Sequence, residues 1–264
     1  MVQKLTVRRP TFDFTDLPVR WVGGSTLGTR YGNAGHVFIP LGEQFFIDTV
    51  RGFRDELDDD ELRADVTAFI GQESVHRRAH EQLWAVLVDQ GVPVEAYADV
   101  ISSIRSIERF VPPRLRLSVT AALEHYTAAF GLSFLTEDLA SAVPDEMARL
   151  LAWHGLEELE HRSVAFDVLQ TVDDGYALRV AGFVVASVML AVVPAVGVVM
   201  FRGSPARGRT VAPGSASSTD LVGMSCRLAV RMGRHLASYL RPGFHPRDLE
   251  MPAEAEVWSA AMAS

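Results

Sequence analysis

Apolar residues recur three or four positions apart along most of this chain, which is the period of an amphipathic helix. Prolines, glycines and a run of aspartates separate the periodic stretches and mark where helices begin and end. The pattern therefore predicts an all-α protein. The expected helices cover about 41–57, 59–90, 94–109, 113–139 and 144–172.

The two ends of the chain differ from this periodic part. Residues 1–40 contain too many glycines and prolines for a long helix, so we expect an irregular arm that wraps the domain. Residues 203–219 are rich in glycine, proline, serine and arginine, which predicts a flexible linker. An amphipathic helix and a tail follow, and we expect residues 220–264 to pack on a bundle formed by residues 41–176.

One further helix, expected at 177–202, is apolar throughout. The 22 residues from Val180 to Phe201 carry no charge, and Arg179 and Arg202 flank them. A helix of this length can span a bilayer. Two alternatives stay open: the helix packs on the bundle or lies partly in a membrane, or it crosses the membrane completely. Either alternative points to an apolar substrate or a hydrophobic tunnel.

Two Glu-x-x-His sequences lie within the expected helices: Glu73 with His76, and Glu158 with His161. Residues three apart on a helix lie on the same face, so the carboxylate and the imidazole of each pair can bind one metal ion. The two pairs also fall on apolar stripes, where an isolated charge is costly unless it is paired or binds metal. The repetition therefore predicts a buried site for two metal ions.

Two more carboxylates complete the pattern. Glu43 precedes Glu73 by 30 residues and Glu124 precedes Glu158 by 34, so a helix with one inward glutamate comes before each Glu-x-x-His helix. This is the ligand set of ferritin-like di-iron and di-manganese bundles. We therefore expect a ferritin-like four-helix bundle with extra C-terminal helices. The six expected metal ligands are Glu43, Glu73, His76, Glu124, Glu158 and His161.

Three residues close to the motifs are candidates for catalysis. His154 lies four residues before Glu158 on the same face, so it is either a seventh metal ligand or a core histidine bonded to the backbone. His80 lies four residues after His76, where it can bind metal, support a ligand or face the substrate. Glu157 either orients a metal-binding imidazole of an adjacent helix or is solvated.

Four other polar residues have less specific roles. His125 and Glu160 lie off the apolar stripes, so we expect them at the surface or at the rim of the site. His36 lies in the glycine-rich arm and is expected to be structural. We expect Asp167 to cap or pair with a nearby helix.

Composition narrows the function classes. The 264 residues carry a formal net charge of −8, and an acidic protein of this kind is a poor candidate for nucleic-acid binding. Cys226 is the single cysteine, which excludes an internal disulfide framework and a cysteine-based zinc site and fits a reducing compartment. The N-terminus lacks the apolar core of a signal peptide. We expect a cytoplasmic protein, with membrane association through 180–201 left open.

Four segments resemble the bacterial family labelled predicted metal-dependent hydrolase, and the resemblance extends over about 15–250. The segments are Pro40–Phe46, Gln72–His76, Trp153–Asp167 and Pro242–Pro246. A second resemblance rests on spacing alone: the additional histidine before the last Glu-x-x-His is similar to the ligand pattern of the di-iron arylamine N-oxygenases. That second resemblance implies oxygen chemistry.

Three functions follow from these observations. The first is a non-haem di-iron oxygenase or oxidase that uses two iron ions, O2 and an unidentified electron donor on a small or apolar organic substrate. Manganese, or manganese with iron, would use the same ligands. The second is a metal-dependent hydrolase that uses a metal-activated water. The third is a non-catalytic metal-binding protein. We expect a monomer or a homodimer rather than a storage cage.

Overall fold

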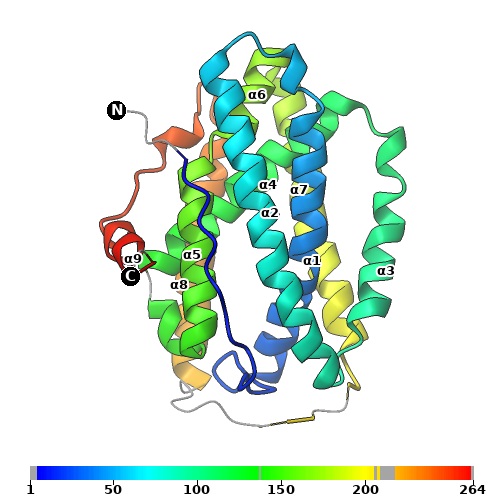
Figure 1. The fold of residues 1–264 in the computed structure, drawn as a ribbon, viewed down its shortest axis with the longest axis vertical. Helices are drawn as coiled ribbons and strands as arrows, with labels where there is room; N and C mark the ends of the chain where they lie inside the picture. The colour runs from blue at the N-terminus through cyan, green and yellow to red at the C-terminus, as the bar shows by residue number, and fades with distance from the viewer. Residues whose placement is uncertain (1–4, 137, 205–206, 209–217, 263–264) are drawn as a thin grey trace.

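The computed structural model describes residues 5–136, 138–204, 207–208 and 218–262 (Figure 1). Within these ranges all regular structure is helical, which confirms the predicted all-α class. The α-helices are α1 (Thr26–Arg51), α2 (Asp60–Asp89), α3 (Val94–Arg105), α4 (Pro113–Thr136), α5 (Asp145–His161), α6 (Val164–Val172), α7 (Tyr176–Met200), α8 (Ser218–Tyr239) and α9 (Glu254–Met262).

Four long helices form the central bundle. α1 packs along α2, and α4 packs along α5, so the chain makes two helical hairpins (Figure 1). α2 also contacts α5, and α1 contacts α4, which joins the hairpins. Fully buried apolar side chains such as Phe69, Leu83, Leu117 and Trp153 fill the space between the helices. Each hairpin thus brings one glutamate helix beside one Glu-x-x-His helix.

The N-terminal arm is shorter than expected. The prediction of an irregular segment over 1–40 is wrong after Ser25, because α1 begins at the next residue. The Ser25 side chain accepts a hydrogen bond from the Gly28 N–H and caps the helix. Gly32 serves packing, since a Cβ there would lie 2.5 Å from the Trp21 ring. Gly32 therefore makes room for the arm instead of ending the helix.

α1 also continues through a proline. Pro40 has no N–H to donate, so the carbonyl of His36 lacks its usual partner within the helix. Trp84 of α2 donates its Nε1–H to this carbonyl over 3.1 Å. The bond satisfies the carbonyl and ties α1 to α2 near the start of the predicted helix. α1 then ends at Arg51, before the predicted end at 57.

Other helix bounds agree more closely with the pattern. The side chain of Asp59 caps α2, which starts and ends one residue inside the predicted range. α3 and α4 begin where predicted and end earlier. The single helix predicted over 144–172 is wrong in its middle, because α5 ends at His161 and α6 begins three residues later. Arg162 lies in the break and donates to the carbonyl of Leu159, near the α5 terminus.

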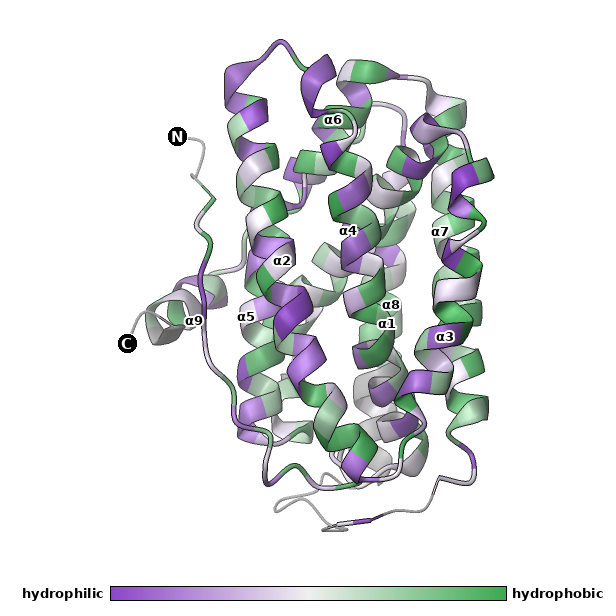
Figure 2. Ribbon diagram, turned by 45° about the vertical axis from the view of Figure 1, so that its right-hand side comes forward, coloured by the Kyte–Doolittle hydropathy of each residue, from purple (hydrophilic) through white to green (hydrophobic). Residues whose placement is uncertain are grey.

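α7 lies against the bundle on one side and is exposed on the other. Gly182 packs on Ser118 of α4, and Gly197 packs on Ala34 and Tyr97 of α1 and α3. α7 is the one helix in the described part of the chain that is long and apolar enough to cross a membrane, and 28% of its most apolar window is buried. Figure 2 shows its hydrophobic character along most of its length. Its outward side chains include Val184, Val188, Val192 and Val199.

The C-terminal segments cover α4 and α6. α8 packs on α4, and it buries His125, whose Nε2 lies 2.9 Å from the carbonyl oxygen of His235. The prediction of a surface position for His125 is therefore wrong, because a helix distant in sequence covers it. After α8, His245 and Arg247 bind the carboxylate of Asp167, which fulfils the pairing expected for that residue. Most of the predicted linker at 203–219 lies outside the described residues.

Candidate metal centre

The bundle brings the six expected ligands and His154 into one buried volume. They form two groups, and within each group the possible ligand atoms all lie within 4.8 Å of one another. All seven side chains are buried, which sets them apart from an ordinary acidic surface cluster. The first group is Glu43, His76 and His154, and the second is Glu73, Glu124, Glu158 and His161.

Two carboxylates of the second group also reach the first. Glu73 Oε1 lies 3.1 Å from His161 Nε2 and 3.6 Å from His76 Nδ1. Glu158 places Oε2 at 3.4 Å from His161 Nε2 and Oε1 at 3.7 Å from His76 Nδ1. Both glutamates of the Glu-x-x-His pairs therefore lie between the two imidazoles. A carboxylate in this position can bridge two metal ions.

The other two carboxylates lie at opposite ends of the cluster. Glu43 Oε1 is 3.6 Å from His154 Nε2, and Glu124 Oε2 is 3.2 Å from His161 Nε2. α4 and α5 come unusually close here, since a Cβ on Gly131 would lie 2.5 Å from the backbone of α5. This close approach helps to bring the α4 glutamate within reach of the α5 imidazole.

The donor atoms fit a pair of divalent cations. Eight of them are buried and have no hydrogen-bond partner, although unpartnered buried polar atoms are rare and costly. Two divalent ions would give these atoms partners, and their four positive charges would balance four carboxylates. The eight atoms are both oxygens of Glu43, Glu73 and Glu124, together with His76 Nδ1 and His161 Nε2.

Each ligating imidazole is held from behind by a residue of the opposite hairpin. Glu157 Oε2 lies 3.0 Å from His76 Nε2, and Gln72 Oε1 lies 3.0 Å from His161 Nδ1. These contacts fix the ring orientations and leave His76 Nδ1 and His161 Nε2 facing the carboxylates. Glu157 and Gln72 each precede the glutamate of a Glu-x-x-His pair. Each hairpin therefore orients the imidazole of the other.

The N-terminal arm supports both of these contacts. Arg8 lies 3.2 Å from Glu157 and 2.7 Å from Glu160, and Gln72 donates its amide to the carbonyl of Thr6 over 3.1 Å. Of the two positions expected for Glu160, the surface is wrong, because Arg8 covers its carboxylate and leaves the side chain 3% exposed. Arg8 and Gln72 were missed by the sequence prediction. Aligning the two motifs on each other would have indicated Gln72, which occupies the position of Glu157.

The carboxyl pKa values divide the four glutamates into two classes. Burial, reinforced by the charge of Glu73, raises the pKa of Glu43 well above its usual range. Burial and the charge of Glu158 raise the pKa of Glu124 to about 8. Burial also opposes ionisation of Glu158, but the adjacent His161 and a second imidazole outweigh it and lower the pKa. The end carboxyls therefore favour protons and the central ones favour charge.

The two imidazoles respond to the same carboxylates. Burial lowers the pKa of His76, but the hydrogen bond to Glu157 and the charge of Glu73 outweigh burial and raise that pKa to about 10. The pKa of His161 is also raised, since the charge of Glu158 overcomes the effect of burial. Four carboxylates in one buried volume thus attract positive charge strongly, whether as protons or as metal ions.

A chain of buried imidazoles leads away from the first group. His154 places Nε2 at 2.7 Å from Glu158 Oε1 and Nδ1 at 2.8 Å from His80 Nε2. His80 Nδ1 lies 2.7 Å from His36 Nδ1. His80 therefore stands behind His154 and outside both groups. Burial lowers the pKa of His36 to about 3, and the charge of His154 adds to this effect. The imidazole at this end of the histidine row is therefore neutral.

An apolar cavity of about 400 Å³ reaches the first group. Glu43, His154 and Glu158 line it, and α1, α4, α5, α7 and α8 contribute its other walls. The other four members of the two groups do not line it: Glu73, His76, Glu124 and His161. Glu43 and His154 of the first group, with Glu158 of the second, therefore face a space in which a small molecule can bind, and the other four side chains are enclosed.

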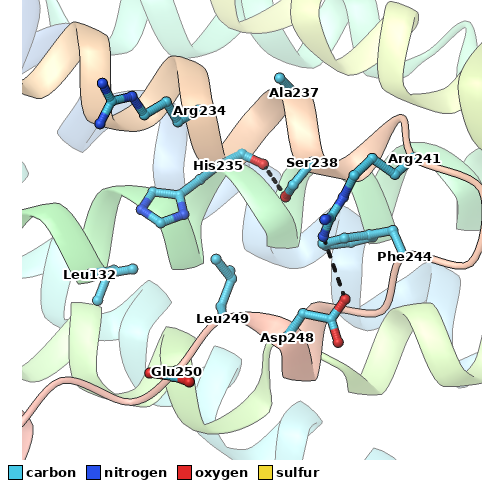
Figure 3. A pocket seen from close by; sticks show the side chains of 10 residues that line it. All are labelled: Leu132, Arg234, His235, Ala237, Ser238, Arg241, Phe244, Asp248, Leu249 and Glu250. Atoms are coloured by element: carbon cyan, nitrogen blue, oxygen red, sulfur yellow. Dashed lines mark hydrogen bonds and ion pairs between the residues drawn. The ribbon is translucent and has the colours of Figure 1, made fainter.

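A second cavity, of about 600 Å³, lies beside α8 and the C-terminal loop (Figure 3). Arg241 and Asp248 face each other there at 3.7 Å, and Ser238 donates its hydroxyl to the carbonyl of His235. No residue of either metal-binding group lines this cavity. It is therefore separate from the carboxylate–imidazole cluster.

Comparison with known proteins places the chain in a family. The family described as predicted metal-dependent hydrolase matches residues 6–250. Searches of curated proteins and of solved structures find no significant match. The family match includes both helical hairpins and the C-terminal loop, and the two buried groups could hold a pair of metal ions. The chain thus belongs to the predicted metal-dependent hydrolase family, as its sequence motifs indicate.

Proposed function

We propose that this protein is a dinuclear metal-dependent hydrolase. The observation that carries the proposal is the set of eight unpartnered ligand atoms, two of which belong to Glu43 at the wall of a cavity large enough for a small molecule. The family match supports hydrolysis as the reaction class. The metal ligands would be Glu43, Glu73, His76, Glu124, His154, Glu158 and His161.

Bound divalent ions would polarise a carbonyl group and lower the pKa of a water molecule. The side chains on the cavity side would manage the proton. Glu43 lines the cavity, so a carboxylate oxygen of Glu43 that does not bind metal would be placed to accept a proton from the attacking water and return it to the leaving group. Thr127 donates its hydroxyl to Glu158 Oε2 and holds that carboxylate in place.

Two residues act through the ligands they contact. Glu157 accepts from His76, Trp153 and Arg8, so it is a positioning residue that fixes one imidazole. His80 contacts His154 and fixes which ring nitrogen carries the proton. Neither residue lines the apolar cavity, so we assign neither a direct contact with the substrate.

The donor set favours oxygen activation as a second candidate function. Two Glu-x-x-His pairs, two further glutamates and an additional imidazole suit two iron ions, and manganese could replace one or both. This function requires O2 and an external electron donor in addition to an organic substrate in the same cavity. Hydrolysis requires neither, so oxygen and reductant separate the two functions.

The test uses one protein preparation loaded separately with zinc, manganese or iron. Under anaerobic conditions, we expect each active form to hydrolyse members of a panel of esters and amides, in proportion to bound metal, and a chelator should abolish the activity. Uptake of O2 by the reduced iron form is measured in parallel. Uptake without anaerobic hydrolysis would replace the hydrolase with an oxygenase. Metal binding with neither activity would leave a non-catalytic protein.

A further inference from the structure

The cavity beside the first group has an unusual charge distribution. The described residues of its walls include no lysine or arginine, and their ionisable groups other than tyrosine are Glu43, His154 and Glu158 at one end. The walls are otherwise dominated by apolar side chains such as Phe38, Phe46, Leu123, Leu190 and Met232. A ligand that fills this cavity therefore meets hydrocarbon along its body and polar groups at one end only.

Two glycines of α1 make room for this cavity, although neither close packing nor backbone conformation requires a glycine at these positions. Gly35 and Gly42 are seven residues apart, so they lie on the same face of the helix, and both line the cavity. A Cβ on Gly35 would have no neighbour within 4 Å, and one on Gly42 would make only an ordinary contact with Phe38 at 3.8 Å. Neither glycine has a positive φ.

These glycines destabilise the helix and leave open space in the cavity. Glycine in a helix interior costs about 1 kcal/mol relative to alanine. Gly32, one turn earlier, is explained by its contact with Trp21, whereas Gly35 has no such explanation. The open wall fits a ligand that lies against the backbone of α1.

An unpartnered polar group marks the inner end of the cavity. Glu43 is 2% exposed, both of its oxygens lack hydrogen-bond partners, and it lines the cavity next to His154. The carboxylates at this end would repel an anion, and the wall residues that the structure describes include no cationic side chain to compensate. A cationic ligand would lose its hydration along an apolar passage.

We propose that this cavity binds an uncharged substrate with a hydrocarbon body, whose ester or amide group lies at the end formed by Glu43, His154 and Glu158. The position of the reactive group rests on the proposed function, whereas the binding preference rests on the walls alone. A cavity of about 400 Å³ has the size of ordinary small-molecule sites. Medium-chain acyl esters and amides are the matching substrate class.

Displacement of an uncharged apolar dye, Nile red, from the cavity tests the binding preference in the absence of turnover. Octanamide, octanoate and octylammonium share one chain length and differ in charge. We expect octanamide to displace the dye from the metal-free protein, in the presence of chelator, at a concentration at least roughly tenfold lower than either ion. Equal or stronger displacement by either ion would overturn the proposal.

Filling the open wall provides the second test. Gly35→Leu and Gly42→Leu should each weaken dye and octanamide binding roughly tenfold or more. Gly233→Leu is the matched control, because Gly233 is an exposed helical glycine of α8 with no neighbour near its Cβ and does not line the cavity. Circular dichroism and metal content establish folding of each variant. Unchanged binding in two folded cavity variants would refute the proposal.

Failure of the proposed hydrolase function gives different results from failure of the proposed binding site. If octanamide binds preferentially and the glycine variants lose binding, but no metal form hydrolyses methyl octanoate, then the hydrolase is wrong and the apolar ligand site stands. If hydrolysis occurs but the cavity variants keep wild-type KM and kcat, the substrate binds elsewhere. The two results separate the site from the reaction.

Discussion

The two hairpins of the bundle carry the same motif in different surroundings. In one, the His76 imidazole contacts the carboxylate of Glu157, and in the other the His161 imidazole contacts the amide of Gln72. A carboxylate makes an imidazole a stronger electron donor than an amide does. The group of His76 also includes Glu43 and His154, which line the apolar cavity, whereas the group of His161 reaches that cavity only through Glu158. The internal repeat thus produces two unequal metal positions.

This inequality indicates which position does chemistry. Glu43 and His154 belong to the same group as His76. Both line the cavity, so a substrate can approach the first group from the cavity. Neither Glu124 nor His161 lines either of the two cavities described above, and both side chains are completely buried. We infer that an ion held by Glu124 and His161 would be mainly structural and electrostatic, and that an ion held by Glu43 and His154 would contact the substrate.

The largest effect is expected from a residue shared by both positions. Glu73→Ala removes a carboxylate between His76 and His161, so the affinity for both ions should fall. The loss of activity should exceed the roughly ten- to hundredfold loss that follows removal of an outer partner of a metal ligand. Metal content after gel filtration and the rate of hydrolysis measure the effect.

Glu81→Ala is the matched control for this change. Glu81 lies on the same helix, is largely exposed and pairs with Arg77 away from the metal centre. The control should keep two ions and wild-type activity. If Glu73→Ala also kept both ions, Glu73 would not bridge them, and the two positions would be independent of each other.

A smaller effect is expected from the residues that orient the imidazoles. Glu157→Gln keeps the shape of the side chain but removes the charge beside His76, so affinity for the cavity-facing ion should fall roughly ten- to hundredfold. Gln72→Met removes a neutral acceptor from His161 and should weaken the enclosed ion less. Calorimetric titration with the metal ion measures both sites. Equal losses in the two variants would show that charge is not what distinguishes the hairpins.

Much of this comparison was open to prediction from the sequence. Metal binding demands particular residue types at helical spacing, so Glu-x-x-His on an apolar stripe identifies both helices and the direction of each side chain. The preceding glutamates, Glu43 and Glu124, follow from the repeat. The structure brings all of these residues together with His154. Local spacing was sufficient because each constraint acts within one or two helical turns.

Contacts between distant segments were not predictable in the same way. Arg8 reaches Glu157 across 149 residues, and no local pattern requires it. His125 is buried because α8 covers it, although its place on α4 suggests a surface position. The glycines before Pro40 suggest a broken chain, yet Trp21 and Trp84 supply the packing and the hydrogen bond that keep α1 helical. Tertiary contacts override local propensity at these sites.

The pH dependence of stability should distinguish metal-free from metal-loaded protein through Glu124. Its pKa is about 8 in the folded chain and 4.5 without the fold. Between these values the folded state binds a proton that the unfolded state has lost, so the contribution of Glu124 to stability falls as pH rises toward 8. Glu124→Gln removes this contribution. The free energy of unfolding of the variant, minus that of the wild type, should therefore increase over this range.

Metal should reverse the effect, because a bound ion displaces the proton and metal affinity rises with pH. Denaturant unfolding of both proteins at several pH values, with chelator and with metal, measures the differences. A wild-type-minus-variant difference that does not change between pH 5 and 8 in chelator would contradict a protonated Glu124 in the metal-free fold.

The smallest effect concerns the helix that carries the cavity-facing glutamate. Pro40 interrupts the hydrogen bonds of α1 just before Glu43, and Trp84 supplies the donor for the His36 carbonyl. Trp84→Phe keeps an aromatic ring but leaves this carbonyl without a donor, which should cost about 1–3 kcal/mol of unfolding free energy. α4 has no proline between its first turn and Glu124, so the other hairpin has no equivalent weakness.

A double-mutant cycle separates the lost hydrogen bond from lost packing. Pro40→Ala restores a backbone N–H that can donate to the His36 carbonyl. It should therefore stabilise the Trp84→Phe protein more than the wild type, in which Trp84 already fills that role. Equal stabilisation in both backgrounds would mean that the indole contributes packing alone. A positive coupling would show that α2 holds α1 in register at the point where α1 presents Glu43 to the cavity.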